Sequence, residues 1–331
     1  MYGTLVPAKS RSGMTYLVVK SSLEQLIRNG EIQQICRSNG WIDVDADQRK
    51  QDKVGYTGPE RRTCKVVDFT LFPLSIKEQL RRTHSVEVVL GYGQRAREIA
   101  LQAKLAAKTD LSVLIQGKTG TGKEMVALML HELSKRKDKP FIKMSCGVPP
   151  ALIESELFGY ERGSFTGTFR NKLGRLRLAN GGTIFLEKIE SLSLYVQKRL
   201  LGFLEDRMVT SSDGTRAVKV DARIVSATNG NLMDQVRANT FREDLFYRLN
   251  EFEIRMPPLR ERSDDISYLA TQFLCMANAE LGKNVFGFSE EAIDFLSQRD
   301  WSGNIHELKN AIRRAIVVAD DVIEVEHLTY C

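Results

Sequence analysis

The stretch of sequence that decides the fold reads Leu111-Ser-Val-Leu-Ile-Gln116 and continues as Gly117-Lys-Thr-Gly-Thr-Gly-Lys123. The first part is a short apolar run typical of a buried strand, and 124–137 has the spacing of a helix. A glycine-rich loop that ends in Gly-Lys between a strand and a helix has the form of a phosphate-binding loop. We therefore predict a nucleotide site at Gly117, Lys118, Thr119, Gly120, Thr121, Gly122, Lys123 and Glu124.

The residue types of this loop explain the prediction. Glycines let backbone N–H groups curl around an anion, and the N-terminus of the following helix adds its positive dipole. Lys123 is placed to reach the outer phosphates of a nucleotide. Glu124 departs from the common form, because most such loops carry Ser or Thr at this position as a magnesium ligand.

Strands and helices alternate around this loop, which is typical of a parallel sheet covered by helices. Beyond Asp264 the pattern is helical only. We predict an α/β domain over 86–262 and a small all-helical lid over 263–331. The expected strands are 111–116, 141–145, 183–186, 222–228 and 251–256, and the expected helices are 124–137, 192–206, 266–281, 289–299 and 305–319.

Residues 1–85 look separate from the rest. Tyr16–Val19 reads as a strand, Ser21–Ser38 has apolar residues at helical spacing, and Val66–Leu71 reads as a second strand. A β–α–β arrangement is expected, although the segment is too short for a complete doubly wound domain.

Composition narrows the function classes. The 331 residues hold no apolar run of membrane-spanning length and no signal-peptide pattern, so a cytoplasmic protein without a membrane partner is expected. The five cysteines are scattered without a C-x-x-C pair, which indicates reduced thiols. The net charge of +6 is uneven: residues 1–80 carry +3, 81–180 carry +9 and 181–331 carry −6.

Several further motifs follow the loop in a fixed order. Together they resemble the AAA+ domain of sigma-54-dependent transcriptional activators over about residues 86–328. The Phe-Thr-Gly loop is the most specific of them, and the Gly-Lys-Glu ending of the phosphate loop is also this family's form. The motifs are Glu154–Gly159, Gly163–Thr168, Gly181–Leu186, Ala227–Asn229, Phe241–Leu249, Pro257–Arg262 and Trp301–Asn304.

The resemblance implies a P-loop AAA+ fold and a ring-forming ATPase that uses ATP and Mg²⁺. It implies that Asn229 is the first sensor and that Arg242 and Arg248 reach the ATP of a neighbouring subunit. It also implies that a surface loop over 161–170 contacts the sigma-54 RNA polymerase holoenzyme. The contact residues of that loop are Gly163, Ser164, Phe165, Thr166, Gly167 and Thr168.

The second acidic motif departs from the family. The family places Asp and then Glu after the strand, where the Asp holds magnesium and the Glu polarises the attacking water. Here these positions are Glu187, which can still reach a metal, and Lys188, which cannot accept a proton while charged. Ser145 replaces the family's restraining Asn, and His306 replaces the second-sensor Arg. Hydrolysis by the usual route is expected to be weak or lost.

Groups that act on the subunit's own nucleotide are altered, whereas groups offered to other proteins remain. This favours a subunit that binds nucleotide, hydrolyses it poorly and completes a competent relative's site in a homo- or hetero-oligomeric ring. One alternative is a non-catalytic adaptor that modulates an active paralogue, and another is a decayed protein that merely folds. A third is a working enzyme whose base is Glu190, although Glu190 is expected to face elsewhere.

A DNA-binding function is the weaker interpretation of the basic charge. Family members commonly end in a helix-turn-helix, and none is evident before Cys331. Residues 289–317 are too acidic to be the DNA reader and are expected to form the lid. Residues 1–85 faintly resemble a shortened receiver-like module, with 68–73 as its last strand; a partly ordered interaction segment is the alternative.

Overall fold

The computed structural model gives the backbone of four strands between residues 5 and 43, and describes residues 90–91, 93–160, 172–210, 217–283, 285 and 287–329. The chain divides into two units. One comprises 75–265 together with 300–307, and the other comprises 1–74, 266–299 and 308–331. The first holds the predicted α/β domain, and the inclusion of 300–307 in it was not predicted.

The α/β unit is built on a five-stranded parallel sheet in the order β13-β5-β12-β9-β6. All five predicted strands are confirmed, with small changes at their ends. The strand that precedes the phosphate-binding loop lies inside the sheet, between β13 and β12. The strands are β5 (Val113–Gln116), β6 (Phe141–Ser145), β9 (Thr183–Glu187), β12 (Arg223–Thr228) and β13 (Phe252–Arg255).

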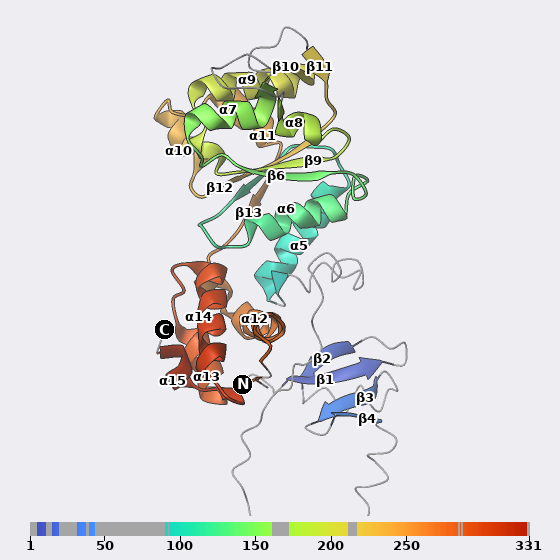
Figure 1. Cartoon of the computed structure of the whole chain (residues 1–331), viewed down its shortest axis with the longest axis vertical. Coiled ribbons are helices and arrows are strands. Elements are labelled where there is room, and N and C mark those ends of the chain that lie inside the picture. Colours follow the sequence, from blue (N-terminus) through green and yellow to red (C-terminus); the bar gives the residue numbers. More distant parts are fainter. Residues whose placement is uncertain are drawn as a thin grey trace, which may run out of the picture. The chain divides into compact units, whose positions relative to one another are not determined.

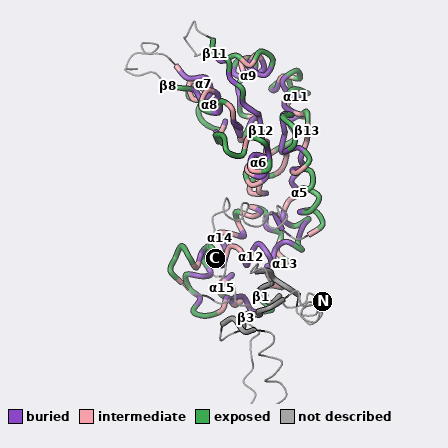
Figure 2. Tube along the Cα trace, turned by 90° about the vertical axis from the view of Figure 1, so that its right-hand side faces the viewer, coloured by how far each residue is buried: buried purple, intermediate pink, exposed green. Residues whose placement is uncertain are grey.

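Alternate residues along each strand enter two separate cores. Leu114 and Ile184 belong to one core, whereas Val113, Ile115 and Phe185 belong to the other. This follows from the two-residue period of a strand, whose successive side chains point to opposite faces. Both faces are therefore buried, as the apolar runs predict. Figure 2 shows buried residues along the sheet and exposed residues on the outer turns of the helices.

Helices cover both faces of the sheet (Figure 1). The helices α5 (Gln94–Ala107) and α6 (Lys123–Glu132) pack on one face. The other face is covered by α7 (Pro150–Phe158), α8 (Arg175–Leu178), α9 (Leu194–Asp206), α10 (Leu232–Arg237) and α11 (Glu243–Leu249). The predicted α/β sandwich is thus confirmed.

The helix predicted over 124–137 ends earlier, at Glu132. Ser134 turns the chain there, because its Oγ donates to the carbonyl of His131 at 2.7 Å and accepts the N–H of Arg136 at 3.0 Å. Side-chain hydrogen bonds of this kind compete with the helix ladder. The charged residues that follow therefore belong to a turn.

Short elements complete the α/β unit. They are two hairpin pairs, β7 (Gly159–Tyr160) with β8 (Lys172–Leu173) and β10 (Met208–Thr210) with β11 (Ala217–Lys219), and two 3₁₀ helices, η1 (Ile189–Ser191) and η2 (Leu259–Asp265).

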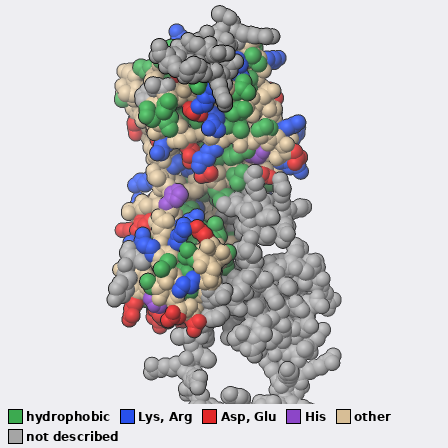
Figure 3. Space-filling view, in the orientation of Figure 1, with side chains coloured by type: hydrophobic (Ala, Val, Ile, Leu, Met, Phe, Trp, Pro, Cys, Tyr) green, Lys and Arg blue, Asp and Glu red, His purple; other side chains and the backbone are tan. Residues whose placement is uncertain are grey.

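The lid is helical, as predicted. It contains α12 (Ile266–Leu281), α13 (Glu290–Gln298), α14 (Asn304–Val318) and α15 (Val325–Thr329), with β14 (Gly287–Phe288) paired to β15 (Val322–Ile323). Acidic side chains gather at the lower end of the lid in Figure 3. The exposed acidic residues of the lid include Glu290, Glu291, Asp294, Asp320 and Asp321. This surface is a poor match for a polyanion.

The N-terminal strands correct one prediction. The β–α–β arrangement is wrong for the described residues, because β1 (Leu5–Ser10), β2 (Thr15–Val19), β3 (Ile32–Arg37) and β4 (Gly40–Asp43) form an antiparallel sheet in the order β2-β1-β3-β4. The last residues of the predicted helix over 21–38 form the strand β3, which pairs with β1 on one edge and with β4 on the other. A short run of apolar residues is compatible with a helix or a strand, and here the pairing with two neighbouring strands decides between them. The strand predicted over 66–71 lies outside the described residues.

Two findings bear on the expected class of protein. In the part of the chain that the structure describes, no helix combines the length and apolar character that crossing a membrane requires. Cys146 and Cys275 are buried free thiols, and burial raises the pKa of Cys146 to about 12.

The close approach at Gly182 yields a stability prediction. A Cβ at this position would lie 2.0 Å from the carbonyl oxygen of Pro140, which accepts the N–H of Thr183 where β9 begins. We expect Gly182→Ala to lower the free energy of unfolding by about 1–3 kcal/mol, measured by urea denaturation. Gly202→Ala in α9 is the control, because a Cβ there meets nothing within 4 Å; it should raise stability by about 0.5–1 kcal/mol. Equal stability of the two variants would contradict the close approach.

Candidate functional site

The carboxyl ends of four neighbouring strands bring the predicted site residues together. In the register of the sheet, Gln116 lies beside Thr228, Ala227 beside Glu187, and Glu187 beside Ser145. The loop after β5, Asn229 after β12 and Lys188 after β9 therefore leave the same edge of the sheet. In open α/β sheets this edge is where ligands bind.

The loop over 117–123 has the backbone of an anion cradle. Gly120 and Gly122 have φ values of +80° and +98°, in the left-handed region that side chains rarely adopt. Gly122 caps α6, a ten-residue helix that begins at Lys123. Thr121 closes the turn, because its Oγ1 donates to the carbonyl of Lys118 at 2.8 Å. The helix N-terminus thus presents its unpaired N–H groups at the loop.

The Lys123 side chain folds over this loop. Its Nζ donates to the carbonyls of Gly117 at 2.7 Å and Lys118 at 3.0 Å, and to Oδ1 of Asn229 at 2.9 Å. Burial lowers the pKa of Lys123, and the charges of Glu190 and Glu187 oppose that shift. The predicted loop lysine and the predicted first sensor are therefore in direct contact.

Glu190 belongs to the site, and the expectation that it faces elsewhere is wrong. Its Oε1 accepts the backbone N–H of Asn229 at 3.2 Å and the side-chain Nδ2–H of Asn229 at 3.1 Å. The chain does not continue as a strand after β9, because Lys188 has φ +54° and η1 follows at once. This turn carries Glu190 back toward Asn229, which spacing along a strand cannot show.

Glu187 is part of an ion triad at the edge of the site. Lys143 Nζ lies 2.6 Å from Oε2 of Glu124 and 3.4 Å from Oε2 of Glu187, and these carboxylates raise the pKa of Lys143 against its burial. Among the described residues no group of three His, Cys, Asp or Glu side chains is placed to hold a metal ion. Glu187 therefore lies next to a cation that it shares with the carboxylate of Glu124.

Lys188 lies along the turn after β6. A Cβ on Gly147 would stand 2.8 Å from Cδ and 3.4 Å from Nζ of Lys188, so the lysine side chain lies over this glycine. Ser145 Oγ accepts the N–H of Gly147 at 3.3 Å. Lys188 is exposed. The two substituted positions of the sequence are thus neighbours in space.

The segment 301–306 packs onto the phosphate-binding loop. Ile305 donates its N–H to the carbonyl of Gly120 at 2.9 Å, and Asn304 Nδ2 donates to the carbonyl of Thr119 at 2.9 Å. Asn304 is 1% exposed, and its Oδ1 accepts the N–H of Leu259 at 2.8 Å. His306 is exposed, and its Cδ2 would lie 3.2 Å from a Cβ at Gly120. The sequence analysis singled out 301–304 as a motif but did not predict this contact with the loop.

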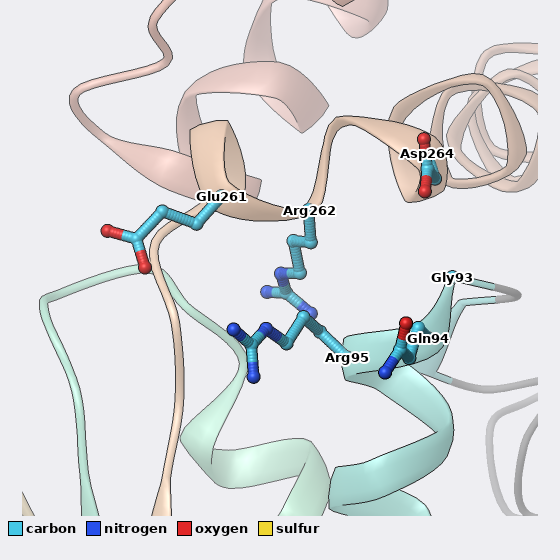
Figure 4. A pocket seen from close by; sticks show the side chains of 6 residues that line it. All are labelled: Gly93, Gln94, Arg95, Glu261, Arg262 and Asp264. Carbon is cyan, nitrogen blue, oxygen red and sulfur yellow. The ribbon is translucent and has the colours of Figure 1, made fainter.

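A polar pocket of about 240 Å³ adjoins the loop (Figure 4). Arg262 connects the two, because its Nη2 donates to the carbonyl of Thr121 at 2.6 Å. Arg262 is 3% exposed, and burial lowers its pKa while Asp265 opposes that shift. Sequence reasoning missed this pocket, which is lined by Gly93, Gln94, Arg95, Glu261, Arg262 and Asp264.

The two arginines predicted to act on a neighbouring subunit lie on and beside α11. Arg242, the N-cap residue, forms a bidentate pair with Asp244 at 3.0 and 2.6 Å, and that pair raises the pKa of Arg242. Arg248 is exposed in the last turn of the helix. The described structure therefore shows a local ion pair at Arg242.

The predicted sigma-54 contact loop, Gly163–Thr168, lies outside the described residues. Its two ends are described, and they meet as the antiparallel pair β7 and β8. Gly174 and Gly159 bring the backbones of these ends together, since a Cβ on Gly174 would lie 2.6 Å from the N atom of Gly159.

Comparison with protein families matches two regions of the chain. Residues 89–255 match the sigma-54 interaction domain, and residues 260–330 match the AAA+ ATPase lid domain. These regions correspond to the α/β unit and the lid described above.

Curated relatives are similar over about three quarters of the chain. The DNA-binding transcriptional activator HyfR of Escherichia coli (strain K12) is 40% identical over 73% of this chain and 36% of its own length. The nitrogen fixation protein AnfA of Azotobacter vinelandii is 41% identical over 74% of this chain and 46% of its own length. The chain thus spans less than half the length of these relatives.

A solved structure agrees with the fold. The crystal structure of NtrX from Brucella abortus in complex with ATP is 30% identical and has a TM-score of 0.66. It covers 72% of this chain and 53% of NtrX.

Proposed function

Because the chain belongs to the sigma-54 interaction domain family and carries an AAA+ lid, we propose that it is a sigma-54-interacting transcriptional regulator that binds ATP and hydrolyses it weakly or not at all. The observation that carries the proposal is the site at one edge of the sheet. There the phosphate-binding loop is built in full, whereas Lys188 stands in the place of the carboxylate that activates water.

The loop residues fit a nucleotide. Left-handed Gly120 and Gly122 open the backbone, the N-terminus of α6 supplies N–H donors and a positive dipole, and Lys123 supplies a cation. A similar protein, NtrX, has been crystallised in complex with ATP, which supports the same ligand here. The triphosphate would be held by 117–123, with His306 beside the loop at Gly120.

The site offers fewer ligands for Mg²⁺ than for the nucleotide. Magnesium sites of this kind use one or two carboxylates together with substrate phosphates and water. Glu187 is the carboxylate available at the end of β9, and it already lies 3.4 Å from Lys143 Nζ. Glu187 would therefore hold the ion together with the phosphates of the nucleotide and with water.

The substitutions at Lys188 and Ser145 are expected to slow the hydrolysis of ATP. A general base must accept a proton, and a charged lysine cannot do so. Lys188 also rests against Gly147, beside Ser145, at the place where the family carries its restraining Asn. The family's proton-accepting Glu and the Asn that restrains it are thus both replaced, by Lys188 and Ser145, which are neighbours in space.

The groups offered to other proteins support a role in a mixed ring. Arg242 and Arg248 lie at the surface of α11 and can act on a neighbouring subunit's nucleotide if Arg242 leaves Asp244. The loop with Phe165 and Thr166 would contact sigma-54. A homo- or hetero-oligomeric ring with relatives that hydrolyse ATP is the assembly in which these groups are used.

A non-catalytic adaptor is the second candidate, and the intact hydrogen-bond network of Lys123 in the phosphate-binding loop favours it over a decayed protein. An adaptor would bind nucleotide to fix its shape and would modulate an active paralogue without remodelling the promoter complex. The two candidates differ in whether the chain raises the ATP turnover of a mixed ring.

Nucleotide binding is the first testable consequence. We expect Lys123→Ala to weaken binding of a non-hydrolysable ATP analogue by about 10–100-fold, since a hydrogen bond to a charged group contributes about 1.5–3 kcal/mol. Titration calorimetry measures the affinity. The control is Lys137→Ala, which removes an exposed lysine away from the loop and should leave the affinity unchanged. Unaltered binding by Lys123→Ala would place the nucleotide elsewhere.

The partner assignment has its own test. Purified wild-type protein, mixed with an intact relative, should bind sigma-54 and raise the ATP turnover of the mixture. Phe165→Ala should lose sigma-54 binding but keep nucleotide binding, because the 117–123 loop is untouched. If the wild-type protein neither binds sigma-54 nor alters turnover, alone or mixed, the regulator proposal is wrong.

Restoring the family's residues tests the cause of weak hydrolysis. We expect Ser145→Asn, Glu187→Asp and Lys188→Glu together to raise the rate of ATP hydrolysis by about 10²–10⁴-fold, the usual contribution of a positioned base. Lys188→Gln is the matched control, because it removes the cation without adding a base. No gain in the triple variant would locate the defect elsewhere, with His306 the next residue to change to Arg.

A further inference from the structure

Glu190 has no role in the proposed function, yet it occupies the centre of the site. We propose that Glu190 is a positioning residue: it fixes the side-chain amide of Asn229, so that Asn229 Oδ1 faces the Lys123 ammonium, and thereby sets the preference of the site for a triphosphate over a diphosphate. This inference rests on the proposed binding of nucleotide at 117–123.

The hydrogen bonds form a directed chain. Glu190 Oε1 accepts Nδ2–H of Asn229 at 3.1 Å, and Oδ1 of the same amide accepts Nζ–H of Lys123 at 2.9 Å. A carboxylate accepts hydrogen bonds and an ammonium only donates them, so only one orientation of the amide satisfies both neighbours. The second bond to Glu190, from the backbone N–H of Asn229 at 3.2 Å, fixes the carboxylate in turn.

The core determines the place of Glu190. Ile189, the preceding residue, is 0% exposed and belongs to the core beneath α7 and α9. Lys188 makes the left-handed turn that starts η1. Glu190 is thus presented to Asn229 by a turn anchored on a buried side chain, and its position does not depend on a flexible loop.

Glu190 is connected to Lys123 through the side chain of Asn229. Among the described residues Lys123 forms no direct ion pair with Glu190; its partners are the neutral Asn229 and two backbone carbonyls. A direct carboxylate partner would compete with phosphate for the ammonium. A neutral amide held by a carboxylate keeps Lys123 in place while leaving it available to an anion.

The second carboxylate oxygen of Glu190 is in a position that packing alone does not explain. Oε2 is shielded from solvent and has no hydrogen-bond partner in the described part of the chain. A buried carboxylate oxygen left in this state lowers stability. The nearby ammonium of Lys123 offsets that penalty, since Glu190 is the largest opposing charge on Lys123. Glu190 and Lys123 are therefore close to each other, with the amide of Asn229 hydrogen-bonded to both.

Two variants of Glu190 separate positioning from charge. Dissociation constants of a non-hydrolysable ATP analogue and of ADP are measured by calorimetry, and their ratio is the readout. Glu190→Ala should lower the preference for the triphosphate about tenfold, because Asn229 is no longer held. Glu190→Gln should keep the preference, since its carbonyl oxygen still accepts from Asn229. Glu205→Ala, an exposed glutamate of α9, is the charge control and should match wild type.

A double-variant cycle adds a readout that a purely structural role would not move. Asn229→Ala should lower the ratio as Glu190→Ala does, and adding Glu190→Ala to Asn229→Ala should change it by less than about twofold. Glu190→Met, matched in length, replaces Glu190→Ala if circular dichroism shows that the latter does not fold.

The outcomes distinguish a failure of the proposed function from a failure of this inference. A wild-type protein that binds neither nucleotide overturns both the proposed function and this inference. Normal binding with an unchanged ratio in Glu190→Ala overturns the inference alone. A Glu190→Gln variant that behaves like Glu190→Ala also overturns it, because the effect would then come from the charge and not from the orientation of Asn229.

Discussion

The buried ammonium of Lys123 is the interaction on which the rest of the site depends. A cation out of water needs acceptors, and here two loop carbonyls and the amide oxygen of Asn229 provide them. These bonds curl the loop after β5 and tie it to the end of β12. The polar ends of two neighbouring strands are thereby joined around one charge, and Glu190 extends the network to the turn after β9.

The sheet makes this arrangement possible. Because all five strands are parallel, their carboxyl ends meet at one edge, and because both faces are covered, that edge is where polar groups can gather. The side-chain amide of Asn304 and the backbone N–H of Ile305 also hold the loop, because they donate to the carbonyls of Thr119 and Gly120. The phosphate-binding loop is thus held by hydrogen bonds from two parts of the chain that are distant in sequence.

The substitution at Lys188 reverses the charge at its position. Lys188 places a cation where the family has a carboxylate, and its side chain lies over Gly147. Glu190 places a carboxylate two residues further on, inside the site. The carboxylate of Glu190 therefore lies near the loop, whereas the position of the family's general base is occupied by Lys188. This is the physical basis for separating nucleotide binding from hydrolysis in the proposed function.

The sequence by itself determined the five strands, the two-layered burial and the phosphate-binding loop, because strand periodicity and glycine spacing are local properties of residues such as Val113, Leu114 and Gly120. Only the tertiary structure decided that Glu190 faces Asn229, that Arg242 pairs with Asp244, that Arg262 contacts the loop, and that 32–37 is a strand. Each of these depends on a turn or on a partner distant in sequence. Spacing along the chain carries no information about such contacts.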